Sequence, residues 1–238
     1  MTWEWKGHGV VRVGQDRWVE VSPSQFTHEA DGLAIIRAIL PDETPFRAWS
    51  NFEFRDSHGR WHEVDLLLLG RERLYLIELK YYSGTLRGDD QRWARDGRRP
   101  EDSPLKLARR KAQYFAGKLQ DELRLWAREQ NTQIPNERDV IPFVQESVFL
   151  HHPDFRCVLR ESSAIGLYGL DGNEARSNLP GISELVLAPA QRRAIGRNQG
   201  CPPANDDGPN RPSRNPATAS SSPPRPSSSA STSATSTG

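Results

Sequence analysis

Two apolar runs joined by a short turn decide the fold of this 238-residue chain: EVDLLLL at residues 63–69 and LYLIELK at residues 74–80. Each run has the length of a strand, and nearly unbroken apolar runs are typical of strands inside a sheet that is covered on both faces. Side chains alternate along a strand, so Glu78 and Lys80 lie on the same face as Leu76. The second run therefore predicts a carboxylate and an ammonium group at the end of an apolar face.

These charged groups predict a site for a divalent cation, because unpaired charges would be costly to bury there. Antiparallel pairing through the turn at residues 70–73 would bring Asp65 beside Glu78. Two such carboxylates can share a hard cation, Mg²⁺ or Mn²⁺, through their oxygen atoms. Asp65 and Glu78 are thus the predicted metal ligands.

The chemistry expected of such a site is hydrolysis of a phosphodiester. A bound cation polarises the phosphate and lowers the pKa of a bound water. Lys80 would orient this water or stabilise the developing negative charge. Glu29, near the start of a predicted helix, is a candidate supporting residue; the alternative is a carboxylate that only interacts with the helix dipole. The predicted catalytic residues are Asp65, Glu78, Lys80 and Glu29.

The surrounding elements predict an α/β fold. Helical periodicity and a following proline indicate a helix over residues 25–40, and a Ser-Pro pair indicates a long helix over residues 104–129. The other expected elements are strands at residues 10–13, 18–21, 46–55 and 141–150, and a hairpin or loop at residues 83–103. Trp93 in that hairpin is expected in the core. His151 and His152 point to opposite sides of an extended chain, which favours a structural loop over a metal site.

The composition separates a foldable part from a tail. Residues 196–238 contain no Leu, Ile, Val, Met, Phe, Tyr or Trp, so burial cannot offset their ordering entropy, and we expect residues 191–238 to be disordered. The chain has no apolar run of membrane-helix length, no signal-peptide pattern and only two cysteines, far apart. We therefore expect a cytoplasmic protein with no membrane partner.

A local basic face is the only sign of nucleic-acid binding, because the net charge is just +1. Between residues 105 and 118 the predicted long helix carries basic side chains and no acidic ones. The basic residues expected to contact nucleic acid are Lys106, Arg109, Arg110 and Lys111. A solvated helix face is the alternative interpretation.

Asp65, followed thirteen residues later by Glu78-Leu79-Lys80, resembles the Asp…Glu-x-Lys signature of the PD-(D/E)XK nuclease superfamily. The neighbouring features that carry a closer resemblance are Glu29, Ser83-Gly84-Thr85-Leu86, Trp93 and Ser103-Pro104. Together they make residues 27–125 similar to the nuclease-related domain (NERD) family. The resemblance implies a restriction-endonuclease-like core with a mixed central sheet flanked by helices. It also implies a Mg²⁺-dependent site that acts on DNA, with RNA left open.

The wider sequence resembles the N-terminal region of large serine/threonine kinases of phage-growth-limitation and BREX-type defence systems. The segments that carry this resemblance include residues 149–155 and 166–172. It implies other defence-system proteins as partners. The chain has no kinase Gly-rich loop, His-Arg-Asp or Asp-Phe-Gly motif, so we expect no kinase activity from it. Because such relatives continue toward a kinase domain, the tail is either a flexible segment or the remnant of a truncated relative.

Two positions depart from the family pattern. Val64 replaces the proline of the superfamily name, and Leu107 replaces a glutamine that is common in the family; Gln113 is the candidate substitute as a nucleic-acid contact. The expected organisation is N-terminal strands (1–24), the NERD core (25–130), a C-terminal extension (131–190) and a disordered tail (191–238). The alternative function is a catalytically silent nucleic-acid-binding or docking module. The oligomeric state is left open.

Overall fold

A six-stranded sheet forms the centre of the computed structural model, which describes residues 17–189. Parallel and antiparallel neighbours are mixed in the order β1-β2-β3-β4-β8-β10, which confirms the predicted mixed central sheet. The bounds are β1 Trp18–Glu20, β2 Arg47–Arg55, β3 Trp61–Leu69, β4 Arg73–Lys80, β8 Phe143–Leu150 and β10 Leu167–Tyr168.

The two apolar runs form the antiparallel pair β3–β4 in the middle of this sheet. The turn between them is closed by the Gly70 N–H, which donates to the Arg73 carbonyl at 2.9 Å, and Leu66 lies opposite Ile77. On its other side β4 pairs in parallel with β8. The run at residues 74–80 is apolar because almost every side chain of β4 is buried, on both faces of the sheet.

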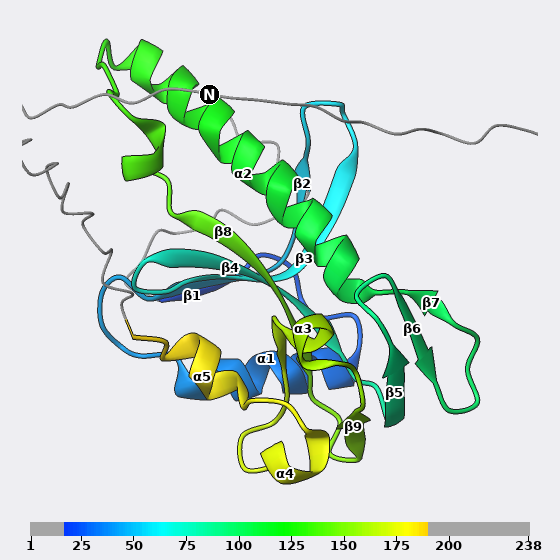
Figure 1. Cartoon of the computed structure of the whole chain (residues 1–238). Helices are drawn as coiled ribbons and strands as arrows, with labels where there is room; N and C mark the ends of the chain where they lie inside the picture. Colours follow the sequence, from blue (N-terminus) through cyan, green and yellow to red (C-terminus); the bar gives the residue numbers. More distant parts are fainter. Residues whose placement is uncertain (1–16, 190–238) are drawn as a thin grey trace, which may run out of the picture. The chain divides into compact units, whose positions relative to one another are not determined.

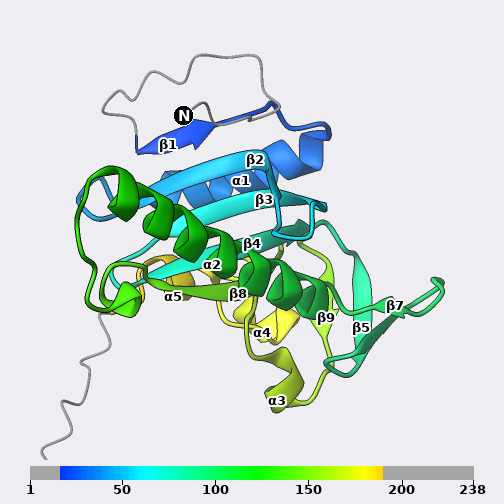
Figure 2. The ribbon, with the colours of Figure 1, turned by 90° about the horizontal axis from the view of Figure 1, so that it is seen from above.

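One long helix covers each face of the sheet (Figures 1 and 2). α1, Thr27–Ile39, packs Ile36 into the core on one face, where the short helix α5, Ile182–Val186, also lies. α2, Pro104–Glu129, packs an apolar stripe that includes Phe115 into the core on the other face. Each fully buried side chain of this size contributes about 1.5–3 kcal/mol to stability. The sheet therefore separates two cores.

Local chemistry explains where the two long helices begin and end. The Ser103 hydroxyl accepts the Lys106 N–H at 3.4 Å, and Pro104 occupies the first helical position, where no N–H is needed. α1 begins after Phe26 without a side-chain cap and ends before Pro41. Both predicted helices are confirmed to within two residues.

A smaller four-stranded sheet follows the end of β4 (Figure 1), in the order β7-β6-β5-β9. Its bounds are β5 Gly84–Gly88, β6 Arg92–Arg95, β7 Glu101–Asp102 and β9 Phe155–Cys157. Trp93 is almost fully buried here with Leu86 and Phe155, which confirms its expected place in the core. The hairpin interpretation of residues 83–103 is correct.

Four short elements complete the described residues: the 3-10 helix η1 Glu137–Asp139, α3 Glu161–Ala164, α4 Glu174–Ser177 and the already named α5. The strand predicted at residues 10–13 and the disordered tail predicted at 191–238 lie outside the described residues. Among the helices of residues 17–189, none is both long and apolar enough to span a membrane. The division of the chain into segments 1–24, 25–130, 131–190 and 191–238 stays a prediction.

The β2–β3 hairpin changes face halfway along its length. Leu66 contributes to the core on the α1 side, whereas Val64, two residues earlier, contributes to the core on the α2 side. A regular strand would place both on one face. β2 changes face at the same level, at Asn51, whose φ is +55°. Asp65 therefore lies where the regular ladder is interrupted.

Candidate active site

The structure brings Asp65 and Glu78 together across the β3–β4 pair. The ladder places Leu66 opposite Ile77, and the two carboxylates are the next residues along the two strands. One Asp65 oxygen accepts the backbone N–H of Leu79 at 2.7 Å, which ties the carboxylate to β4. The interrupted ladder and this hydrogen bond together orient Asp65.

Two lysines contact the Glu78 carboxylate, one on each oxygen. Lys80 Nζ, from the same strand, lies 3.4 Å from Oε2, and Lys111 Nζ, from α2, donates to Oε1. The side chain of Glu78 is only 7% exposed. A nearly buried carboxylate is thus neutralised by one cation from the sheet and one from the helix.

The surroundings of Asp65 and of Lys80 shift the pKa of each group. Burial, followed by the charge of Glu78, raises the pKa of Asp65 to about 6, although both lysines and the Leu79 N–H act in the opposite direction. Burial lowers the pKa of Lys80, but the charges of Glu78 and Asp65 outweigh it and raise the pKa above its usual value. Lys80 is therefore charged at neutral pH.

Two carboxylates of this kind fit a hard divalent cation. Mg²⁺ is commonly held by one or two carboxylates, with waters and substrate phosphates completing its coordination. Within residues 17–189, no cluster of three or more His, Cys, Asp or Glu side chains could hold a metal ion. The raised pKa of Asp65 agrees with cation binding, since a cation between the carboxylates would remove their repulsion.

Glu29 lies in the first turn of α1 and is half-buried. Burial raises its pKa first, and the next cause is the charge of Glu63 on β3. The structure thus places Glu29 near Glu63, and not in a three-residue metal cluster with Asp65 and Glu78. Its supporting role stays a prediction.

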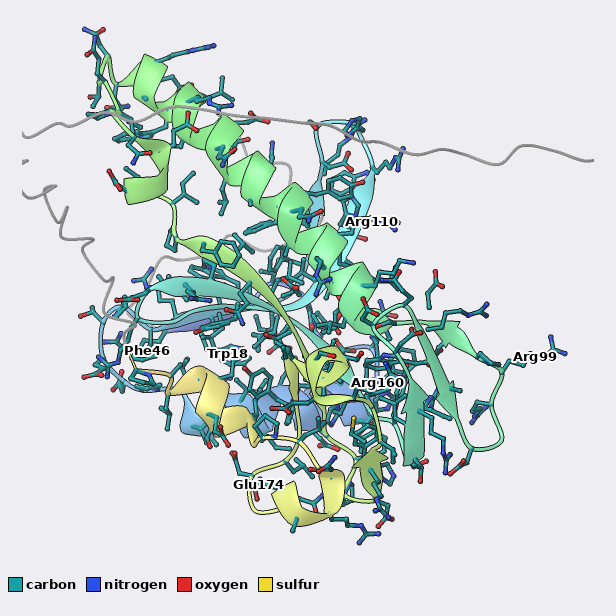
Figure 3. The ribbon with its side chains drawn as sticks, viewed as in Figure 1. Trp18, Phe46, Arg99, Arg110, Arg160 and Glu174 are labelled. Atoms are coloured by element: carbon teal, nitrogen blue, oxygen red, sulfur yellow. The ribbon has the colours of Figure 1, made fainter. Side chains whose placement is uncertain are left out.

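The basic run of α2 divides into two groups. Lys111 is turned to Glu78, and Arg109 Nε pairs with Glu146 Oε1 at 2.7 Å. The remaining members, Lys106, Arg110 and Gln113, recur at helical spacing and form one stripe. Arg110 projects from α2 (Figure 3). Arg109, Arg110 and Gln113 are exposed and Lys106 is partly exposed, and nucleic-acid contact by this run stays a prediction.

His151 and His152 follow β8 and do not join a metal cluster among the described residues. His151 is buried against Phe149, with ring centroids 5.2 Å apart. His152 Nδ1 accepts the Asp154 N–H at 3.0 Å, which closes the loop. Both rings also contact Tyr81. The geometry agrees with the structural-loop interpretation.

Sequence reasoning missed the contact between Lys111 and Glu78. It treated Lys111 only as a nucleic-acid contact, although a signal was available. Lys111 borders the apolar stripe of α2, which includes Ala108 and Ala112 and packs on the face of β4 that carries Leu76. Glu78 is the next residue on that face of β4.

A mixed sheet between helices, with an aspartate beside a Glu-x-Lys strand end, defines a restriction-endonuclease-like domain. The sequence model of the family described as "Nuclease-related domain" (NERD) matches residues 5–150. The chain belongs to this family, as its sequence motifs predict.

The chain is also similar to the probable kinase PglW of Streptomyces coelicolor. The two are 42% identical over 109 residues, which are 44% of this chain and 7% of that protein. This chain therefore corresponds to a small part of that relative's length. No solved structure gives a significant match.

Proposed function

We propose that this chain is a Mg²⁺- or Mn²⁺-dependent nuclease domain that acts on DNA. The observation that carries the proposal is the Asp65–Glu78 pair with Lys80 beside it, in a site where burial and repulsion already raise the pKa of Asp65. Asp65 faces the charge of Glu78 in a nearly buried place, and a bound cation would remove that repulsion.

Each residue has a distinct part in this proposal. Asp65 and Glu78 hold the cation, which when bound polarises the phosphate and lowers the pKa of a water. The Leu79 N–H keeps Asp65 oriented. Lys80 positions the attacking water or stabilises the charge that develops on the phosphate. The flexible side chain of Lys111 can release Glu78 and bind a phosphate oxygen of the substrate instead.

We place this activity in phage defence. The support is the resemblance to the N-terminal region of phage-growth-limitation and BREX-type kinases, together with the identity to a probable kinase PglW. The nuclease-related domain would act beside other defence proteins. The kinase activity named for that relative is not proposed for this chain, which has no kinase motif.

The test is cleavage of supercoiled plasmid by the full chain with Mg²⁺ or Mn²⁺. Asp65→Ala and Lys80→Ala should each lower the initial rate about 100-fold or more. Glu53→Ala is the matched control, since it removes an exposed carboxylate from the neighbouring strand β2. Equal background cleavage by wild type, Asp65→Ala and Lys80→Ala would overturn the enzyme proposal.

A second candidate is a catalytically silent nucleic-acid-binding or docking module. The observation that favours it is that Lys80 and Lys111 pair with the two oxygens of Glu78, one of the two proposed metal ligands. This candidate expects DNA retention in a filter or shift assay without cleavage. Retention should fall when Lys106, Arg109 and Arg110 are all replaced by Gln, because each lost phosphate contact weakens binding and its salt dependence.

A further inference from the structure

Five aromatic rings form a continuous series of contacts at one edge of the molecule. Phe26 stacks on His28, and His28 stacks on Tyr81, each with centroids 5.4 Å apart. Tyr81 then contacts His152 at 4.5 Å and His151 at 5.3 Å. We call these five residues the ring stack.

Three elements bring the ring stack to the candidate active site. Phe26 immediately precedes α1 and His28 lies in its first turn. Tyr81 directly follows Lys80 at the end of β4, and the two histidines follow β8. β4 and β8 are parallel, and the His151 N–H donates to the Lys80 carbonyl at 3.2 Å. Their carboxyl ends therefore share one edge, which is where α/β sheets bind ligands.

The inner end of the ring stack is held firmly. His151 is buried on Phe149, and α1 approaches it at Gly32, where an added Cβ would lie 2.9 Å from the imidazole. Burial, followed by the charge of His28, lowers the pKa of His151 to about 4. The innermost ring is therefore neutral near pH 7 and forms a flat, uncharged support.

The outer end of the ring stack is open to solvent. Phe26, the outermost ring, is 59% exposed, and Tyr81, in the middle of the series, is 45% exposed. Large rings that contact one another and still face water mark a surface that another group covers. No metal cluster forms among the described residues, so the two histidines are not explained by a cation. A flat ring with an accessible π-face is the complementary partner.

We infer that the ring stack is a platform for unpaired bases, so that the substrate class of the candidate site is single-stranded nucleic acid or a duplex with a single-stranded end. The inference rests on the proposed function, because it takes the strand bound on the platform to be the strand that the candidate site cleaves. Every base has a π-face, so the platform accepts strands without a strong sequence preference. Lys80 immediately precedes Tyr81, and its charge acts on the His151 ring, so a strand bound on the platform can continue toward the candidate site.

The test is fluorescence anisotropy of labelled oligonucleotides with the full chain in EDTA, so that binding is read without cleavage. The probes are a single strand of about 16 nucleotides as DNA and as RNA, the matching duplex, and an abasic strand of equal charge. Wild type should bind the base-bearing strands more tightly than the abasic strand. Tyr81→Ala should weaken this binding roughly tenfold and leave the abasic strand unaffected.

Three variants keep the result interpretable. Tyr81→Phe retains the ring and should bind like wild type, and Phe26→Ala should weaken binding in the same direction as Tyr81→Ala. Trp126→Ala removes a ring that is 52% exposed in the last turn of α2, and it should change nothing. Unchanged affinity in both alanine variants of the ring stack, or equal affinity of wild type for abasic and base-bearing strands, would overturn the inference.

The two proposals can fail separately. Ring-dependent binding by a protein that never cleaves plasmid would remove the nuclease but keep the platform. Mg²⁺-dependent cleavage lost in Asp65→Ala, with binding indifferent to Tyr81, would keep the nuclease and remove the platform. If the protein binds none of the oligonucleotides, the platform is removed as well.

Discussion

Two aspartates of the β2–β3 hairpin have opposite environments. At the turn, Asp56 accepts the N–H groups of His58 and Arg60 at 2.8 and 3.0 Å, and His62 Nε2 lies 2.8 Å from its other oxygen. The hydrogen bond from His62 is the main cause that lowers the pKa of Asp56 to about 2. Its hydrogen-bonding capacity is used within the hairpin itself.

The carboxylate of Asp65, farther along β3, uses only part of its hydrogen-bonding capacity. It accepts one backbone N–H and faces the negative charge of Glu78, so its pKa rises to about 6. A carboxylate that stabilises the fold is surrounded by hydrogen-bond donors. A carboxylate that binds a ligand instead keeps oxygen lone pairs free and lies near a like charge. The comparison sets a structural aspartate beside the one proposed to be functional within a single hairpin, and four measurements can break or sharpen it.

The largest expected effect is on cleavage. Asp65→Asn should lower the rate of plasmid cleavage about 100-fold or more, because one anionic ligand is lost. It should not destabilise the metal-free fold, since it also removes repulsion from Glu78. Asp56→Asn should cleave at close to the wild-type rate. Similar rates for the two variants would break the comparison.

The next effect is on Mg²⁺ affinity. Lys111→Met keeps the length of the side chain but removes one of the two ammonium groups that neutralise Glu78. Mg²⁺ should therefore bind roughly tenfold more tightly to this variant, as measured by calorimetry. Lys118→Met is the control, because Lys118 pairs with Glu122 on the same helix. A weaker response to Mg²⁺ in Lys111→Met would show that the lysine supports the cation site.

A thermal effect should be confined to the turn. Asp56→Ala leaves the backbone N–H groups of His58 and Arg60 and the ring of His62 without their acceptor, so the Tm should fall by several degrees. Calorimetric or dichroism melting in EDTA measures this. Asp65→Ala should change the Tm less under the same conditions. A larger loss in Asp65→Ala would mean that the Leu79 hydrogen bond dominates its role.

The smallest effect is in the pH dependence of stability without metal. The folded pKa of Asp65 is raised, so its contribution is fully present below about pH 4 and is lost as the pH rises through about 6. The folded pKa of Asp56 is lowered, so its contribution is present above about pH 4 and is lost as the pH falls toward 2. Urea midpoints measured against pH should flatten between pH 4 and 6 in Asp65→Asn, and between pH 2 and 4 in Asp56→Asn.

Much of the fold and the central pair could be predicted from local pattern. The apolar runs, the short turn and the two-residue period of strands are sufficient to bring Asp65 beside Glu78 and Lys80. The Ser-Pro start of α2 is likewise a local signal. Parallel pairing of β1 with β2 and of β4 with β8 could not be predicted in the same way, because those partners are distant in the sequence.

The sequence by itself determined strands β1 to β4 and β8, the two long helices and the identity of the charged residues at the end of β4. These features depend on periodicity, capping and turn chemistry, which act over a few residues. Only the tertiary structure decided that β2 and β3 change face at Asn51, that Lys111 reaches Glu78, and that rings from three elements meet beside Lys80. Each of these depends on how helices pack on the sheet, and no short stretch of sequence contains that information.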